Sequence, residues 1–432
     1  MSFWWIMAWR SAWSRRFALL LVMLSVTLSV LLWLGVQQLR EDARRSFSHA
    51  LSGVDLIVGP RGSATELMLY SVFQIGRPTR NMGFDGYKTI SEMPQVRWAV
   101  PIQLGDSFHG FPVIGTTPLL FEVFQSQGKR LAWAQGRAFV KPTDDPHAME
   151  EVVLGAEVAR QNKLQLGDEL ILTHGSGGGP EDTDHDDHPL RVVGILQATG
   201  APIDRAVLVN LEGFESMHQG WGMGIAPKAL QAAKAHLPAV TDPHALEPVS
   251  LSAVWVGLHQ RAEVFTVKRK IEGLGKDPLM AVLPGVALDE LWQVVKVVEN
   301  SLMLIGAMVA ISALMSVASV LLVSMGSRRK ELALLRAMGV RPMALLGFVM
   351  LESMWVCIVG LVLGYVACQT LLWLAQDMLR TQWGIMVQPG WPHQESVLSL
   401  LALLAVSALA SLLPAWRAYR LSLMDGLHPP SV

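Results

Sequence analysis

Cysteine and charge are the two things of which this sequence has little. Its 432 residues include two cysteines, Cys357 and Cys368, and both fall in one apolar block. On one helix they would be separated by about 16 Å of helical rise, too far for a disulfide. Charged residues make up 16% of the chain, whereas soluble proteins usually carry about a quarter. The shortage is concentrated in four apolar blocks, which indicates a membrane protein with a sizeable aqueous part.

Sequence motifs of several enzyme classes are also missing. There is no Gly-x-x-x-x-Gly-Lys-Ser/Thr loop, so we expect no ATP hydrolysis by this chain. No nucleophile elbow, zincin helix or Cys/His array occurs either, which argues against a protease function. The formal net charge of −1 says nothing about nucleic acid, but no basic stripe interleaved with aromatics occurs, so we expect no nucleic-acid partner. We therefore expect no catalytic residues and no cofactor bound by this chain.

Four apolar blocks are candidate membrane spans. They cover residues 17–39, a stretch within 294–325, about 344–375 and about 397–413, the last ended by Pro414. An apolar helix of about 20 residues crosses a hydrocarbon core of about 30 Å. In the third block, Gly360 and Gly364 form a small-xxx-small pair, which we interpret as packing within the chain rather than as a dimer face.

The N-terminal segment has a pattern of its own. Trp5, Trp9 and Trp13 recur every four residues among arginines, which is typical of a helix lying in the membrane interface. The apolar block that follows also fits a signal peptide, because Arg15 and Arg16 precede it. It is longer than a typical signal-peptide core and lacks a small-x-small cleavage site, so we interpret it as an uncleaved span.

Basic residues in the short connections orient the spans. Arginines precede the first span, arginine and lysine fill the connection between the second and third, and arginines follow the fourth. The connection between the third and fourth has only Arg380. Both termini are therefore predicted to be cytoplasmic, and residues 40 to about 290 to lie outside the cytoplasm. The basic residues at 40–45 do not fit this orientation. They begin a long translocated domain, however, and the preference of basic residues for the cytoplasmic side is weak in long domains.

The region between the first two spans alternates short strands and helices, an α+β pattern. Strands are expected at Val152–Leu154, Leu170–Thr173, Arg191–Leu196, Ala206–Asn210, Leu251–Leu258 and Leu279–Leu283, and helices at Ala156–Lys163 and Ala262–Leu274. We expect two lobes. Residues 40–117 and 250–290 connect directly to spans and would form a membrane-near lobe, with residues 118–249 as an inserted lobe.

A loop rich in Gly, Asp and His, residues 175–189, interrupts this domain. Imidazole and carboxylate groups suit a divalent metal such as zinc, but about four fixed ligands are needed and the loop fixes none. A solvated hairpin tip is the favoured interpretation, and a weak metal-capturing loop is the alternative. Its candidate ligands are His174, His185, Asp186, Asp187 and His188.

The segment after the second span, SRRKELALLRAMG, predicts a short amphipathic helix on the cytoplasmic face. Its apolar stripe recurs at helical spacing, and Gly339 is a helix stop signal. Such a helix can dock into a groove on a partner protein. An interfacial linker is the alternative. The candidate coupling residues are Arg328, Arg329, Glu331, Leu332, Leu335, Arg336 and Gly339.

This same segment resembles the signature of the FtsX-like permease family, Arg-x-x-Glu-Leu-x-x-Leu-Arg-Ala-x-Gly. The tail Leu413–Leu421 resembles the closing Pro-Ala-x-Arg-Ala motif of that family, with Pro414, Arg417 and Arg420 as candidate residues. In the aqueous domain, EVVLGAEVARQNKLQLGDELIL and LRVVGIL resemble the MacB-type periplasmic domain. The parts also follow one another in the same order as in the family.

The resemblance implies a type VII ABC transporter permease, similar to MacB and LolC/LolE. Its fold class is an α-helical membrane protein with four transmembrane helices and a large α+β periplasmic domain between helices 1 and 2. Such permeases pair with a second copy or a paralogue, and a separate ATPase holds ATP and Mg. The resemblance further implies a bacterial inner-membrane location, contact with lipid, and a periplasmic or outer-membrane partner.

Three functions stay open at this stage. The first is export or extraction of a lipoprotein, peptide, drug or lipid. The second is transmission without transport, activating a periplasmic enzyme, and the third is a zinc-linked transport system.

The expected organisation is 1–16 interfacial helix, 17–39 first span, 40–290 periplasmic domain, 291–326 stalk and second span, 327–342 coupling helix, 343–375 third span, 376–394 short periplasmic loop, 395–416 fourth span and 417–432 cytoplasmic tail.

Overall fold

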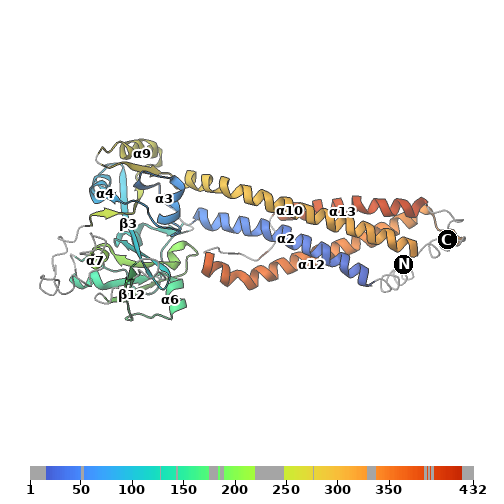
Figure 1. Ribbon diagram of the computed structural model, residues 1–432, viewed down its shortest axis with the longest axis horizontal. Coiled ribbons are helices and arrows are strands. Elements are labelled where there is room, and N and C mark those ends of the chain that lie inside the picture. The colour runs from blue at the N-terminus through green and yellow to red at the C-terminus, as the bar shows by residue number, and fades with distance from the viewer. Residues whose placement is uncertain are drawn as a thin grey trace. The chain divides into compact units, whose positions relative to one another are not determined.

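The computed structural model (Figure 1) describes most of the chain. The described residues are 16–49, 53–126, 128–142, 145–174, 183–184, 189–218, 248–275, 277–327, 337–383, 387, 390 and 394–420. The chain divides into two compact units. We call them the helical unit, comprising Met1–Ala43, Val295–Asp377 and Val387–Val432, and the sheet unit, comprising Arg44–Val294 and Met378–Met386.

Long apolar helices dominate the helical unit. They belong to α2 (Arg16–His49), α10 (Pro284–Ser327), α12 (Pro342–Trp383) and α13 (Gln394–Arg420). Within the described residues, three stretches are long and apolar enough to cross a membrane, namely Leu20–Arg45, Pro284–Val320 and Ser353–Leu379. In α13 the apolar stretch Ser396–Leu409 is shorter. Three of the four expected spans therefore meet this criterion, and the fourth stays a prediction.

The glycine pair of α12 packs against α2. A Cβ added at Gly360 would lie 2.8 Å from a methyl of Val26, and one at Gly364 would lie 2.7 Å from the Cβ of Val30. The Thr27 hydroxyl also donates to the Gly360 carbonyl over 3.4 Å. Backbones approach this closely only where small residues stand, so the prediction that this pair packs within the chain is confirmed.

Polar contacts also join the helices of this unit. Arg40 of α2 pairs with Glu299 of α10 at 2.6 Å. The Gln369 amide of α12 donates to the side-chain oxygen of Gln38 over 2.9 Å. Hydrogen bonds of this kind hold helices together in lipid, where apolar contact alone gives little preference for another helix over a lipid tail.

A mixed sheet organises the sheet unit, with strand order β16-β1-β15-β3-β4-β13-β8-β12-β7. These are β16 (Leu279–Val282), β1 (Leu56–Pro60), β15 (Ala253–Leu258), β3 (Val96–Phe108), β4 (Phe111–Thr116), β13 (Val207–Asn210), β8 (Glu151–Leu154), β12 (Leu190–Leu196) and β7 (Trp133–Gly136). Three short strands branch from this path, β9 (Glu169–Leu170), β10 (Thr173–His174) and β11 (Thr183–Asp184).

Strand β3 connects the two halves of the sheet. Its first part, Val96 to Ile102, pairs antiparallel with β15, and its last part pairs with β4 and β10. The register with β4 shifts between Leu104 and Ser107, which marks a bulge. Bulges bend a strand and redirect its side chains, and this one lies beside the residues described below.

Helices flank the strands at α3 (Ala64–Ser71), α4 (Phe84–Ser91), α5 (Leu119–Val123), α6 (Ala156–Asn162), α7 (Leu211–Met217) and α9 (Val264–Glu272). The expected strand and helix around 152–163 are confirmed as β8 and α6. The run from Leu251 to Leu258 is instead two strands, β14 (Ser250–Leu251) and β15. Ser252 interrupts it, because its backbone N–H donates to Ile102 and its hydroxyl accepts from the Leu104 N–H.

The expected strand from Leu170 to Thr173 also divides in two. Leu170 belongs to β9, which pairs with β12, whereas Thr173 belongs to β10, which pairs with β3. Leu172 between them is completely buried. The division brings His174 to β3, opposite Asp106.

Candidate functional site

The predicted coupling segment lies between α10 and α12. Arg328, Arg329, Glu331, Leu332, Leu335 and Arg336 fall outside the described residues. Gly339 is described, and its φ of +90° is a left-handed conformation that glycine adopts readily. This is the conformation in which helices commonly end, so the backbone at Gly339 is compatible with the predicted helix stop.

The C-terminal motif falls within α13. The side chains of Pro414, Arg417 and Arg420 lie outside the described part of the structure, but the backbone is helical through all three. The sequence predicted that the apolar helix ends at Pro414, and this prediction is wrong, because α13 continues to Arg420. Proline removes one backbone donor, and helices of membrane proteins tolerate that loss when other groups satisfy the freed carbonyl.

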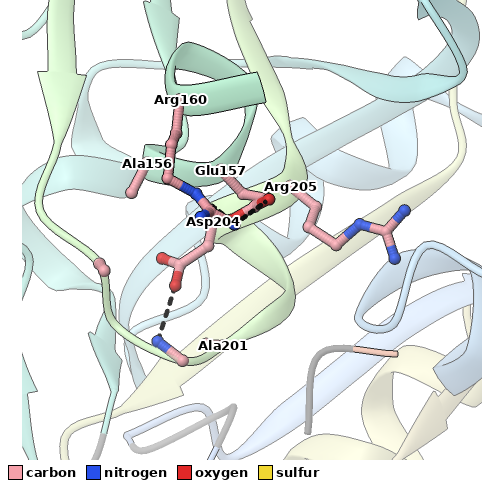
Figure 2. Close-up of a pocket in the computed structure, with 8 residues that line it drawn as sticks. Ala156, Glu157, Arg160, Ala201, Asp204 and Arg205 are labelled. Atoms are coloured by element: carbon pink, nitrogen blue, oxygen red, sulfur yellow. Dashed lines mark hydrogen bonds and ion pairs between the residues drawn. The ribbon is translucent and has the colours of Figure 1, made fainter. Parts of the chain in front are cut away.

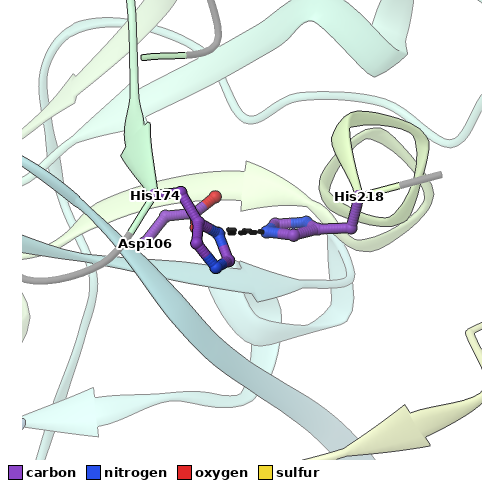
Figure 3. A group of neighbouring side chains, drawn as sticks. All are labelled: Asp106, His174 and His218. Carbon is purple, nitrogen blue, oxygen red and sulfur yellow. Dashed lines mark hydrogen bonds and ion pairs between the residues drawn. The ribbon is translucent and has the colours of Figure 1, made fainter. Parts of the chain in front are cut away.

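Three titratable side chains meet in the sheet unit (Figure 3). Asp106 comes from β3, His174 from β10, and His218 directly follows α7. The two strands pair antiparallel with His174 opposite Asp106, so that the two side chains stand next to each other. One carboxylate oxygen, Asp106 Oδ1, lies 3.0 Å from His174 Nδ1 and 3.1 Å from His218 Nε2, and the two nitrogens are 3.2 Å apart. We call these three residues the Asp106 cluster.

The ring of His218 is held in place by Phe214, one helical turn earlier. His218 Nδ1 donates to the Phe214 carbonyl at 2.7 Å, because a carbonyl can only accept. The two rings also stack, with centroids 4.6 Å apart. In the neutral ring the proton therefore sits on Nδ1, and the lone pair of Nε2 points at Asp106 and His174.

Burial differs across the Asp106 cluster. The Asp106 side chain is fully buried at 0% exposure, His218 is 16% exposed and His174 is 36% exposed. Burial acts to lower the pKa of His218, but the hydrogen bond to Asp106 and the charge of Asp106 outweigh it and raise this pKa above its ordinary value. Burial also raises the pKa of Glu215, which lies near His218. The cluster thus places a buried carboxylate against two imidazole rings, of which His174 is the more exposed.

The structure places one of the five predicted loop ligands in the cluster. His174 is there, whereas His185, Asp186, Asp187 and His188 lie outside the described residues. Sequence reasoning missed Asp106 and His218. They stand 68 and 44 positions from His174, and only sheet pairing and helix packing bring them together. The one local signal was an aspartate inside a largely apolar strand.

A pocket lies beside α6, apart from the Asp106 cluster (Figure 2). It is a cavity of about 100 Å³ whose lining includes Glu157, Arg160, Asp204 and Arg205. Glu157 and Arg160 form an ion pair at 2.8 Å. The Asp204 carboxylate accepts from the backbone N–H groups of Thr199 and Gly200, so it fixes the turn between β12 and β13. These interactions stabilise the local fold and give Glu157, Arg160 and Asp204 partners within the chain.

Two protein-family models match the sequence of this chain. A family model described as a MacB-like periplasmic core domain matches residues 19–272, more than half of the chain. A second model, the FtsX-like permease C-terminal, matches residues 303–423. No curated protein sequence matches the chain.

Two solved structures illustrate the similarity. The periplasmic region of MacB from Actinobacillus actinomycetemcomitans shares 13% identity at a TM-score of 0.35, covering 58% of this chain and 95% of the other. The extracellular domain of the noncanonic ABC-type transporter YknZ from Gram-positive bacteria shares 13% identity at a TM-score of 0.30. The match covers 53% of this chain and 98% of the other.

Proposed function

Because the chain belongs to the MacB-type, FtsX-like family of ABC transporter permeases, we propose that it passes ATP-driven movement from a separate ATPase to its own extracytoplasmic domain. The chain itself supplies the membrane helices and the sheet unit. It holds no Gly-x-x-x-x-Gly-Lys-Ser/Thr loop, so ATP and Mg are assigned to the partner ATPase and not to this chain.

The observation that carries this proposal is the position of α10. This helix begins at Pro284, directly after strand β16 ends at Val282, and continues for 44 residues to Ser327. At 1.5 Å per residue it is about 66 Å long. The predicted coupling segment starts at its last residue. One continuous helix thus connects the sheet unit to the segment that we assign to the ATPase contact.

The turn between β16 and α10 is well fixed. The N–H groups of Val286 and Ala287 both donate to the Leu283 carbonyl at 3.1 Å, and Ala287 is buried in the core of the sheet unit. Arg40 pairs α2 with α10 farther along. These contacts hold the first turn of α10 to the sheet unit and, farther along the helix, hold α10 to α2 within the helical unit.

The proposed topology has four spans, with both termini in the cytoplasm of a bacterial inner membrane and the sheet unit in the periplasm. The α13 helix has 27 residues, which is about 40 Å of helix and enough to cross the bilayer, so we assign it as the fourth span. The proposed assembly contains a second permease copy or a paralogue and two ATPase subunits. Its load is a lipoprotein, peptide, drug or lipid handled at the periplasmic side.

The proposal is tested by ATPase measurements on purified components in lipid nanodiscs. The chain alone should show no ATP hydrolysis, and the complex with its cognate ATPase should hydrolyse ATP. Glu331→Lys and Arg336→Glu should each weaken ATPase binding by about tenfold or more, since charge reversal at an interface places like charges together. Lys129→Glu, on the exposed strand β6 (Lys129–Arg130) of the sheet unit, is the matched control and should change nothing.

Two results would overturn the proposal. One is ATP hydrolysis by the chain alone. The other is full ATPase coupling in both charge-reversal variants, which would mean that the coupling segment is not part of the ATPase interface.

A further inference from the structure

The Asp106 cluster brings three electron-pair donors to one point. Asp106 Oδ1, His174 Nδ1 and His218 Nε2 lie 3.0, 3.1 and 3.2 Å apart. These atoms come from a central strand, a hairpin strand and a helix end, so no local sequence effect explains their convergence (Figure 3). We propose that Asp106, His174 and His218 bind a first-row divalent metal ion, with Zn²⁺ as the best match.

The convergence of the three atoms gives the first argument. One oxygen of the Asp106 carboxylate and one nitrogen from each imidazole ring lie within 4.8 Å of one another, and all three are atom types that bind metal ions. The Nδ1 of His218 donates to the Phe214 carbonyl, so its Nε2 is the ring atom that faces Asp106 and His174. A metal ion lying between the atoms would interact favourably with all three.

The distances give the second argument. Zinc binds imidazole nitrogen and carboxylate oxygen at about 2.0–2.2 Å, so neighbouring ligand atoms of a tetrahedral site lie about 3.4 Å apart. In a six-coordinate site with similar bonds, neighbouring ligands lie about 3.0 Å apart. The three observed separations fall between these two values. Small side-chain rotations are enough to complete either geometry.

The surroundings give the third argument. Metal-bound histidines almost always donate their second ring N–H to a carbonyl or carboxylate, which fixes the tautomer and turns the free lone pair toward the ion. His218 does this through Phe214. The partial exposure of His174 leaves a path for the ion and room for water as a further ligand. Three protein ligands with an open position are typical of zinc sites that exchange a ligand.

Ligand chemistry selects the class of ion. Two imidazoles and one carboxylate suit Zn²⁺ and its first-row neighbours, whereas Mg²⁺ and Ca²⁺ require mainly oxygen ligands. A bound ion would fasten β10 and the end of α7 to β3, three elements far apart in the sequence. The site lies wholly within the sheet unit, so the inference does not rest on the proposed ATPase coupling.

The test uses the purified full chain in detergent, treated with a chelator and then desalted. Titration with Zn²⁺ against a competing indicator should give about one ion per chain. His174→Ala and His218→Ala should each weaken binding by about 100-fold or more, because loss of a ligand should exceed the 10- to 100-fold effect of changing an outer-shell partner. Mg²⁺ and Ca²⁺ should not compete.

Two controls locate the site. His147→Ala changes an exposed histidine of the same unit and should leave the affinity unchanged. The double variant His185→Ala/His188→Ala tests the loop that the sequence suggested, and it too should retain the binding. Circular dichroism checks the fold of each variant, and His174→Ala keeps the test valid if His218→Ala disturbs α7.

A second measurement addresses coordination directly. Co²⁺ bound in place of Zn²⁺ should give d–d absorption bands that disappear in His174→Ala. Absence of stoichiometric binding at micromolar Zn²⁺ would overturn the proposal, as would wild-type affinity in the cluster variants. Loss of binding in the loop variant alone would also overturn it, because the ligands would then be those of residues 175–189.

Discussion

The helical unit and the sheet unit differ in where their large apolar side chains lie. In the sheet unit, Leu56, Ile57 and Ile102 are completely buried, and large apolar side chains form the core. The helical unit buries apolar residues such as Val30 and Leu34 together with small polar ones such as Ser29. Many large apolar side chains of its long helices are nevertheless exposed, among them Leu24, Leu28, Ile305, Ile311, Leu363 and Val366.

This difference shows which solvent surrounds each unit. Water drives large apolar side chains into a core, whereas lipid accepts them at the surface and leaves small and polar residues to hold helices together. Contiguous apolar surface on a water-soluble domain would promote association. The same side-chain types therefore stabilise the two units by different means, and substitutions should act differently in each.

The largest expected effect comes from placing a charge on the outer face of each unit. Ile311 of α10 is 60% exposed, and Ile75 of the sheet unit is 56% exposed. Ile311→Lys should disfavour membrane insertion by about 2.5–3.5 kcal/mol, because lysine is costly at the centre of a span. Ile75→Lys should change stability by less than about 0.5 kcal/mol. The yield of each variant in the membrane fraction measures this. Equal yields would contradict the expectation that lipid surrounds the helical unit and water the sheet unit.

A smaller effect is expected from filling the close contact between α2 and α12. Gly364→Leu forces a side chain into space held by Val30, and overpacking typically costs about 1–3 kcal/mol. Gly347→Leu on the same helix is the matched control, since an added Cβ there meets no atom within 4 Å. The midpoint of thermal unfolding in detergent should fall for the first variant only. If both variants unfold alike, the glycine pair does not mark the helix contact.

The smallest effect is expected from ion pairs, one in each unit. Arg40 and Glu299 are both partly buried, whereas Arg261, which pairs with Asp55 at 3.1 Å, is mostly exposed. Arg40→Met should destabilise the helical unit by about 1 kcal/mol, and Arg261→Gln by less, because solvent screens the exposed pair. Thermal unfolding at low and high salt measures both. A larger loss for Arg261→Gln would contradict this ranking.

Local patterns made part of the fold predictable. Hydropathy located the long helices, and β-branched runs located strands such as β8 and β12. Sequence alone missed the break at Ser252, since that residue leaves the strand pattern only because Ile102 and Leu104 of β3 hydrogen-bond to it. It also placed a helix end at Pro414, where the backbone stays helical. Both errors arose from contacts or backbone tolerances that a single segment does not encode.

The candidate site was only partly predictable for the same reason. His174 stood out because it precedes a loop rich in histidine and aspartate. Asp106 and His218 had no spacing relation to it, and their proximity depends on the β3–β10 register and on the end of α7. The predicted coupling residues remain a prediction drawn from helical periodicity and from the family signature.

The central claim is that the sheet unit lies outside the cytoplasm while the coupling segment lies inside it. Single cysteines introduced by His147→Cys and Arg341→Cys, in a chain with Cys357 and Cys368 replaced by alanine, test this with a membrane-impermeant maleimide. Both positions are exposed. The account predicts labelling of His147→Cys in cells whose outer membrane alone is opened, and of Arg341→Cys only after the inner membrane is broken. The reverse pattern, or labelling of both positions from one side, would contradict it.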